Sequence, residues 1–483
     1  MSEPVVVQGT AVASPYDHGT TSAEVQSGGA PSGDFTKGSK QEVRCRDPIF
    51  ALLLYANVGA ICGVVAAYGT SAFEKAFGDT NSTVDWAPYL YAAAVTGVFS
   101  LVLAAIMFLV MMKIPQFMIK TSLIFVVILS GVWCAIAFIG GNIIGGIIGA
   151  VFFLLMMCYA RAVWSRIPFA TENLITAMTA VKKNCGVVFC SYFFLALAFG
   201  WSILWTIALV GIWDETITCE QVGNVNQCSQ PNYGILFGMF VSYFFTHQVI
   251  QNTIHVVVAG VVGTWWFAPD EASSCCSAGI CDSMKRALTT SFGSICFGSL
   301  IVAIIQALRA LANSARANDD GNAILVCIAE CILQCLASIV EYFNKWAFIY
   351  VGLYGYSYLE AGKNVFSLFK NRGWEAIVAD DLVSNTLFFV SVVVGGLAGA
   401  VGLILSKTTD WFEQAASNGQ AASFTLGFII GLVLTSIAMS AIASAVNAVI
   451  VLFAEAPAEF EENHPERSQK MRETWRATYP GCM

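Results

Sequence analysis

Charged residues are scarce in this chain of 483 residues. Lysine, arginine, aspartate and glutamate make up only 12% of the sequence, about half of their share in ordinary soluble domains, and there are only four histidines. Hydrophobic residues make up 57%, and a soluble domain of this length could not bury so much apolar surface. The composition therefore excludes a cytosolic enzyme, a disordered chain and a nucleic-acid binder. It predicts a polytopic helical membrane protein.

Motifs of soluble catalysis are also lacking. The sequence contains no glycine-rich phosphate loop, no HExxH motif and no nucleophile elbow. An ATP-driven pump is disfavoured, because none of the loops could hold a nucleotide-binding domain. We therefore expect no catalytic residues, no metal and no cofactor, and we do not interpret the chain as an enzyme.

Long apolar runs are abundant instead, and ten of them could cross ~30 Å of hydrocarbon as helices. We expect an all-α fold of about ten transmembrane helices, in a domain that covers residues 44–455. Gly140-Gly141-Asn142 leaves only a tight turn between the third and fourth runs, which predicts a helical hairpin. The sixth and eighth runs are unusually long, and each is either one long helix or two segments. We predict single helices, because splitting one run would move the C-terminus to the other side. The runs are 48–68, 88–112, 119–140, 142–160, 185–212, 233–267, 290–311, 323–360, 383–406 and 423–454.

The basic residues are concentrated between alternate runs. If the N-terminus is cytoplasmic, all but five of the 24 lysines and arginines fall on cytoplasmic segments. This bias sets orientation through the positive-inside rule and predicts that both termini are cytoplasmic. Residues 1–43 are rich in Gly, Ser, Thr and Pro and predict a disordered tail. Residues 456–483 form a second, polar cytoplasmic tail. The five exceptions to the bias are Lys75, Arg309, Arg316, Lys407 and Lys345.

Several residues outside the apolar runs suggest covalent modification. Asn81 begins the only glycosylation sequon, in the first outside loop. Cys219 and Cys228 lie in the third outside loop, where a disulfide would persist, although two free thiols are the alternative. Cys275 and its neighbours lie in a cytoplasmic loop. We interpret them as reduced thiols, with palmitoylation or zinc binding as alternatives.

Residues 161–184 form the longest basic cytoplasmic stretch before the fifth run. Leu174, Ile175, Met178 and Val181 fall on one face of a helix there. This pattern is typical of an amphipathic helix that lies at the membrane interface.

Polar residues form a stripe along the eighth run. Glu330, Gln334, Glu341 and Lys345 fall within about 60° of one another on a helix, and Asn344 lies at the edge of the stripe. Each charge in hydrocarbon costs ~2.5–3.5 kcal/mol by insertion scales, so such residues usually face a cavity or a substrate. The stripe is a candidate path for a cation or a proton. Alternatively, Glu341 and Lys345 pair one turn apart and satisfy each other.

The sixth run carries a second polar face. His247, Gln251 and His255 repeat at four-residue steps. The two histidines are separated by about 12 Å of helical rise, which excludes a shared metal ion without ligands from elsewhere. A proton relay, a water-lined cavity and hydrogen bonding between helices remain open.

Aromatic residues gather in the same regions. Trp201, Trp205 and Tyr350 lie deep enough in their runs to form a cage for a quaternary ammonium through cation–π attraction. Anchoring at the membrane interface is the alternative interpretation. Serines at 436, 440 and 444, with Asn447 nearby, predict close helix packing in the last run.

An ordered set of short motifs resembles the choline transporter-like family, including its fungal and protist branches. The motifs are Ser291 to Ile301 (SFGSICFGSLI), Arg166 to Ala170 (RIPFA), Ala259-Gly260 with Gly263 to Phe267 (GTWWF), Phe343 to Phe348 (FNKWAF), Tyr354-Gly355, the stretch from Ala361 to Asp381, and Tyr479-Pro480. The resemblance covers roughly residues 45–480. It implies ten spans with cytoplasmic termini and transport of choline, or of ethanolamine in some members.

The leading hypothesis is a transporter of choline or a related small organic cation that works by alternating access. Proton coupling through Glu330, His247 or His255 would be compatible with it. The alternatives are a membrane scaffold without transport, or a channel or lipid-handling protein. We expect membrane lipids and a small organic cation as partners, and no nucleic acid. The expected location is the plasma membrane, with an internal membrane as the alternative.

Overall fold

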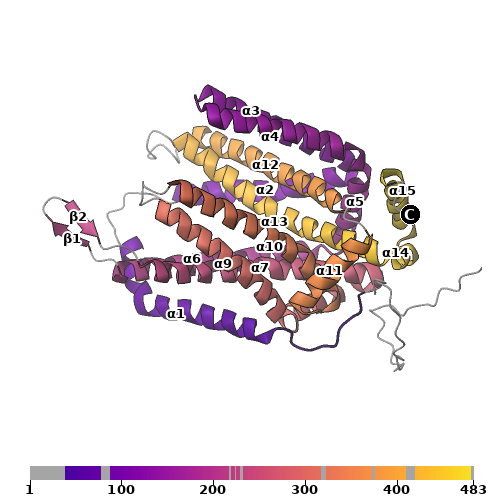
Figure 1. The fold of residues 1–483 in the computed structure, drawn as a ribbon, viewed down its shortest axis with the longest axis horizontal. Coiled ribbons are helices and arrows are strands. Elements are labelled where there is room, and N and C mark those ends of the chain that lie inside the picture. The colour runs from indigo at the N-terminus through magenta and orange to yellow at the C-terminus, as the bar shows by residue number, and fades with distance from the viewer. Residues whose placement is uncertain are drawn as a thin grey trace, which may run out of the picture.

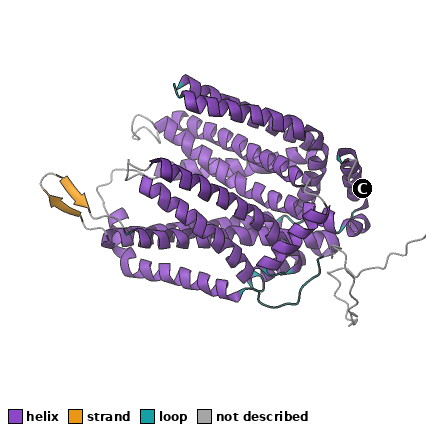
Figure 2. Ribbon diagram, in the orientation of Figure 1, coloured by secondary structure: helices purple, strands orange, loops and turns teal. Residues whose placement is uncertain are grey.

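Ten long helices run side by side and form the body of the protein (Figure 1). The computed structural model describes residues 38–77, 87–216, 219–222, 225–228, 232–316, 323–372, 376–408 and 419–479. Helices dominate this part of the chain, and its only strands form one small hairpin (Figure 2). The all-α prediction is confirmed. The long helices are α1 (Pro48–Phe77), α2 (Ala87–Lys113), α3 (Pro115–Ile139), α4 (Ile143–Val163), α6 (Gly186–Thr216), α7 (Tyr233–Phe267), α9 (Phe292–Arg316), α10 (Ala323–Tyr354), α12 (Ala376–Thr408) and α13 (Gly419–Glu455).

The described residues contain nine helical stretches long and apolar enough to span a membrane, and α10 is not among them. The polar residues of α10 lower its mean hydropathy. Its 32 residues would nevertheless extend ~48 Å as a straight helix, which is long enough to cross a membrane. The backbone N–H of Gly38, which precedes α1, donates to Glu455 at the end of α13. The chain therefore enters and leaves the bundle on the same side. An even number of crossings is therefore required, and α10 supplies the tenth. The sixth run forms a single helix, α7, as predicted. The eighth run forms one long helix only as far as Tyr354, and residues 358–360 already belong to the short helix α11 (Tyr358–Arg372).

Short helices gather at one end of the bundle, which we call the inner end (Figure 1). The charge bias predicts that this end is cytoplasmic. The opposite, outer end carries the hairpin of β1 (Cys219–Val222) and β2 (Val225–Cys228). The helices of the inner end are η1 (Trp164–Arg166), α5 (Ile167–Lys183), η2 (Pro269–Ala272), α8 (Ala278–Leu288), α11 (Tyr358–Arg372), α14 (Pro457–Asn463) and α15 (Pro465–Thr478).

The tight turn between α3 and α4 forms as predicted. Gly141 has a φ of +76°, a conformation that favours glycine. The side-chain oxygen of Asn142 accepts a hydrogen bond from the backbone N–H of Gly145 at 2.8 Å, which caps the start of α4. The hairpin needs no other residues between the two helices.

The prediction of an amphipathic helix at the membrane interface between residues 161 and 184 is wrong about what surrounds this helix. A helix, α5, is present, but both faces of it are largely buried. α15 covers the face that the pattern assigned to water: Trp475 packs edge-on against Phe169 at 4.9 Å, and the Thr176 hydroxyl contacts the Met471 sulfur. The C-terminal tail thus folds back as two helices and replaces solvent at this helix.

The interpretation of Cys275 as a reduced thiol is also wrong, because a disulfide joins it to Cys185 at the inner end. The other cysteine pair is placed by the strand register: Cys219 and Cys228 are direct partners in the antiparallel hairpin. Their disulfide remains a prediction. Asn81 lies outside the described residues.

Candidate transport cavity

A cavity of about 330 Å³ lies between α7, α9, α10, α12 and α13. Polar residues recur on its walls at helical spacing: three and four residues apart on α7, α10 and α13, so each helix turns one polar face inward. Only three of the lining residues are apolar. The lining is Gln248, Gln251, Asn252, Ile254, His255, Val302, Glu341, Asn344, Lys345, Ser384, Ser440, Ala443, Ser444 and Asn447.

His255 joins three of these helices. Its Nε2 lies 2.8 Å from the backbone carbonyl oxygen of Lys345 on α10, and its Nδ1 lies 2.7 Å from the Ser444 hydroxyl on α13. A carbonyl can only accept, so Nε2 carries the proton and donates it. In the neutral ring Nδ1 then accepts a hydrogen bond from Ser444. Both nitrogens are used, and the histidine fixes the distance between α7, α10 and α13.

Glu341 presents an exposed carboxylate in the wall of the cavity. The side-chain amide of Gln306 on α9 donates to its Oε1 at 3.1 Å, and the side-chain amide of Gln248 on α7 donates to Gln306 Oε1 at 3.2 Å. The carboxylate is therefore oriented by a chain of two amides. Gln306 was missed by the sequence analysis, although a glutamine inside an apolar run was a signal.

Two asparagines hold the wall in place. Asn344 donates to the Gly298 carbonyl at 3.0 Å and accepts from the Tyr358 hydroxyl. Asn252 donates to the Ser299 hydroxyl at 2.9 Å. The SFGSICFGSLI motif thus supplies partners for α7 and α10, which explains part of its composition.

Asn447 differs from these two asparagines. Only 3% of it is exposed, and its Oδ1 is buried without a hydrogen-bond partner among the described residues. A buried amide oxygen without a partner is unfavourable, so this atom can accept a hydrogen bond from a molecule in the cavity. From the sequence, Asn447 and the nearby serines are predicted only to pack closely against other helices. These residues line the cavity because α13 turns this face towards α7.

A basic and an acidic residue lie near each other beside the cavity. The Lys345 ammonium is 5.3 Å from the centroid of the Trp346 ring. Asp381, which the sequence analysis did not select, lies within electrostatic range of Lys345. It lines a neighbouring cavity of about 250 Å³ between α3, α4 and α12, and Ser384 lines both cavities.

Five predicted site residues meet in the central cavity: Gln251, His255, Glu341, Asn344 and Lys345. The other residues of the polar stripes lie further towards the outer end. Glu330 is separated from Glu341 by ~16 Å of helical rise, with Gln334 between them. His247 lies two turns outward from His255 and stacks on Tyr243 at 5.8 Å. These three residues remain predictions for an entry route.

The predicted aromatic cage does not assemble. The indole of Trp205 donates to the Met239 carbonyl at 2.9 Å, and that of Trp201 donates to the Tyr243 carbonyl at 3.3 Å. Both tryptophans belong to a small cluster between α1, α6 and α7, whereas Tyr350 is buried in the main core at the inner end. The two tryptophans and Tyr350 therefore lie in different clusters.

Comparison with known proteins agrees with the motifs. The model of the family described as plasma-membrane choline transporter matches residues 147–458, a range that contains every lining residue of the cavity. The chain belongs to the choline transporter-like family. The family is one of membrane transporters, so the resemblance seen in the sequence is confirmed.

Individual relatives cover most of the chain. Protein PNS1 of Mycosarcoma maydis is 28% identical over 449 residues, which are 89% of this chain and 83% of that protein. Protein PNS1 of Debaryomyces hansenii is 28% identical over 441 residues, 87% of this chain and 84% of the relative. A CTL-like protein of Dictyostelium discoideum is 32% identical over 301 residues, 62% of this chain and 51% of the relative. The relatives thus come from fungi and Dictyostelium.

Proposed function

We propose that this transporter moves choline or a related small organic cation across its membrane by alternating access, and that the central cavity is its binding site. The observation that carries the proposal is a polar cavity with an exposed carboxylate, Glu341, inside an otherwise apolar bundle. Its volume of about 330 Å³ is at the lower end of small-molecule pockets and suits a small ligand. We infer the plasma membrane as its location.

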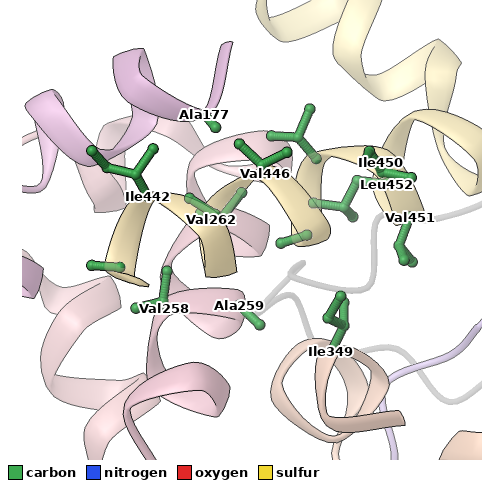
Figure 3. Packing of buried hydrophobic residues seen from close by; sticks show 14 of the residues in the cluster. Ala177, Val258, Ala259, Val262, Ile349, Ile442, Val446, Ile450, Val451 and Leu452 are labelled. Atoms are coloured by element: carbon green, nitrogen blue, oxygen red, sulfur yellow. The ribbon is translucent and has the colours of Figure 1, made fainter. Parts of the chain in front are cut away.

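In this proposal, buried apolar packing on the inner side of the cavity closes the route inward. Val258 and Ala259 of α7, Ile349 of α10, and Val446 and Ile450 of α13 all belong to one buried apolar cluster, part of which is drawn in Figure 3. All five side chains are buried. In the proposed cycle a cation enters from the outer side along the stripe of Glu330 and Gln334, and this packing then parts to release it. An inside-negative potential would favour that movement by ~2.3 kcal/mol per 100 mV.

His255 is the candidate for proton coupling that lies within the cavity. Protonation of Nδ1 would remove the lone pair that accepts from the Ser444 hydroxyl, and so would alter the contact between α7 and α13. The same residue would then sense protons and set the spacing of the helices. Coupled uptake would be faster when the outer side is more acidic.

Ethanolamine is the second candidate substrate. None of the residues that line the cavity is aromatic, so the cation–π contacts that favour quaternary ammonium groups are not offered there. Glu341, Asn447 and Ser440 offer hydrogen-bond acceptors, which a primary ammonium can use and a quaternary one cannot. Direct competition between choline and ethanolamine would separate the two candidates.

Uptake of labelled choline into proteoliposomes tests the proposal. Wild-type protein should exceed empty vesicles, and Glu341→Gln should lower uptake at least tenfold because the carboxylate that attracts the cation is lost. Glu473→Gln, a change of the same kind at an exposed position on α15, should behave as wild type. Wild-type uptake of choline and ethanolamine equal to that of empty vesicles would refute the substrate assignment.

A further inference from the structure

The segment before α1 is docked onto the inner end of the bundle at two points. We call residues 38–47 the N-terminal strap. At the first point Gly38 is buried, and its backbone N–H donates to the carboxylate of Glu455. The backbone N–H of Gln41 donates to the Tyr354 carbonyl at 2.8 Å, and that of Ser39 donates to the Tyr356 hydroxyl at 3.2 Å. Three backbone N–H hydrogen bonds therefore hold this part of the strap.

The second point lies at the start of α1. The backbone N–H of Arg46 donates to the Thr290 carbonyl at 2.8 Å. The Asp47 carboxylate accepts from the Ser294 hydroxyl at 2.6 Å and from the backbone N–H of Tyr358 at 3.2 Å. Residues 42–45, between the two points, are exposed. The strap thus crosses the inner end as a bridge fixed at both ends (Figure 1).

The first docking point lies directly below the central cavity. Tyr354 is nine residues beyond Lys345 on α10, and Glu455 is eight residues beyond Asn447 on α13, so each lies ~12–14 Å further inward. The Tyr354 hydroxyl donates to Glu455 Oε2 at 3.0 Å, which ties the ends of the two helices together. A substrate leaving between α10 and α13 would have to pass this tie and the strap on top of it.

The docked strap also satisfies a buried charge. Glu455 is only 6% exposed, and Gly38 supplies one of its hydrogen-bond donors. A buried carboxylate that loses a donor becomes less stable unless water reaches it. Departure of the strap would therefore favour hydration of Glu455 and separation of the ends of α10 and α13.

We propose that the N-terminal strap is a latch that holds the inner end closed, and that the α10–α13 junction is its docking site. Opening towards the cytoplasm requires Gly38 to leave Glu455 and Tyr354. The proposal rests on the proposed function, because the latch matters only if a substrate leaves on this side. Whatever engages the rest of the N-terminal segment would then set the rate of inward opening.

Gly38 offers a sharp test, because a Cβ at this position would lie 2.6 Å from the Tyr354 ring and 2.8 Å from Glu455 Oε1. Gly38→Ala should therefore weaken docking. The matched control is Gly59→Ala on α1, where a Cβ would meet nothing within 4 Å. Hydrogen–deuterium exchange of the full-length protein in nanodiscs is the readout. Glu455→Gln, which keeps the shape and removes the charge, is the second variant if Gly38→Ala does not fold.

In either variant, exchange of the strap amides at 38 and 41 should rise at least tenfold, and exchange at the inner ends of α10 and α13 should rise with it. Gly59→Ala should match wild type. Faster exchange of the strap with unchanged exchange at α10 and α13 would overturn the latch, and unchanged exchange of the strap in both variants would overturn the docking. These results do not depend on the substrate, so a failure of choline uptake remains a separate outcome.

Discussion

Every residue of α10 from Trp346 to Tyr354 is buried, whereas most residues of the same helix from Ile328 to Ile339 are exposed. α7 shows the same contrast: it is buried throughout from Val256 to Phe267 and largely open near Tyr233. The polar cavity lies where the two regimes meet. This difference describes a transporter whose inner half is closed and whose outer half is loosely packed around α7 and α10. In the alternating-access cycle proposed above, this arrangement would be the outward-facing state.

The closed half is closed by several kinds of contact. Apolar side chains fill the space beneath the cavity, Tyr354 bonds to Glu455, and the strap covers both. In the outer half α12 and α13 are an exception, because they stay in close contact along small residues such as Gly399 and Gly427. The mobile contacts of the cycle should therefore be those of α7 and α10 against α13, with α12 and α13 moving together.

The largest effect should come from a paired glycine substitution that contrasts the two halves. A Cβ at Gly352, in the inner half of α10, would lie 2.6 Å from the Val256 carbonyl oxygen, and this backbone atom cannot give way without separating the helices. Gly352→Ala should lower the free energy of unfolding by about 3 kcal/mol. Gly238→Ala in the outer half of α7 meets nothing within 4 Å and should leave it unchanged or raise it by up to about 1 kcal/mol, because alanine favours a helix. Thermal unfolding in detergent measures both, and equal effects would remove the contrast.

An intermediate effect should follow from substitution of His255, which lies where the closed inner half meets the loosely packed outer half. His255→Leu leaves the Ser444 hydroxyl and the Lys345 carbonyl without their shared partner, and should cost about 2 kcal/mol of stability and at least tenfold in uptake. His255→Gln should recover part of both, since its amide can donate to the same carbonyl. His247→Gln, two turns outward, serves as the control. A larger loss of uptake from the control than from His255→Leu would place the working histidine in the outer half.

The smallest effect should be that of low pH on the stability of the C-terminal helices α14 and α15. Burial lowers the pKa of His464 below its usual value of 6.5, and its Nε2 donates to the Trp265 carbonyl at 3.0 Å. The unfolded state therefore takes up a proton more readily than the folded state. Stability from this residue is intact above about pH 6.5 and falls as the pH decreases below it. The protection factors of the α14 and α15 amides, which are exchange rates corrected for the intrinsic effect of pH, should fall when the pH is lowered from 7.5 to 5.5 in wild type, and fall less in His464→Gln. An equal fall in both proteins would exclude His464 as the cause.

Much of the architecture followed from the sequence because each span needs only its own apolar residues. The bounds of the long helices, the α3–α4 turn and the inward faces of α7 and α10 are local properties. Contacts between helices depend on residues that are far apart in the sequence, which explains why the predictions about such contacts failed. The cage of Trp201, Trp205 and Tyr350 required these side chains to lie together, but the fold places them in different clusters. One face of α5 is covered by α15, which comes from the far end of the chain. Asn447 could join the site only once α13 was placed opposite α7.

A map of the protein in a lipid nanodisc with saturating choline, determined by electron cryomicroscopy, tests the central claim most directly. The account predicts extra density in the cavity between His255, Glu341 and Asn447, with the Tyr354–Glu455 tie intact beneath it in the outward-facing state. Density for choline elsewhere in the bundle, with this cavity empty while the same preparation transports choline, would contradict it.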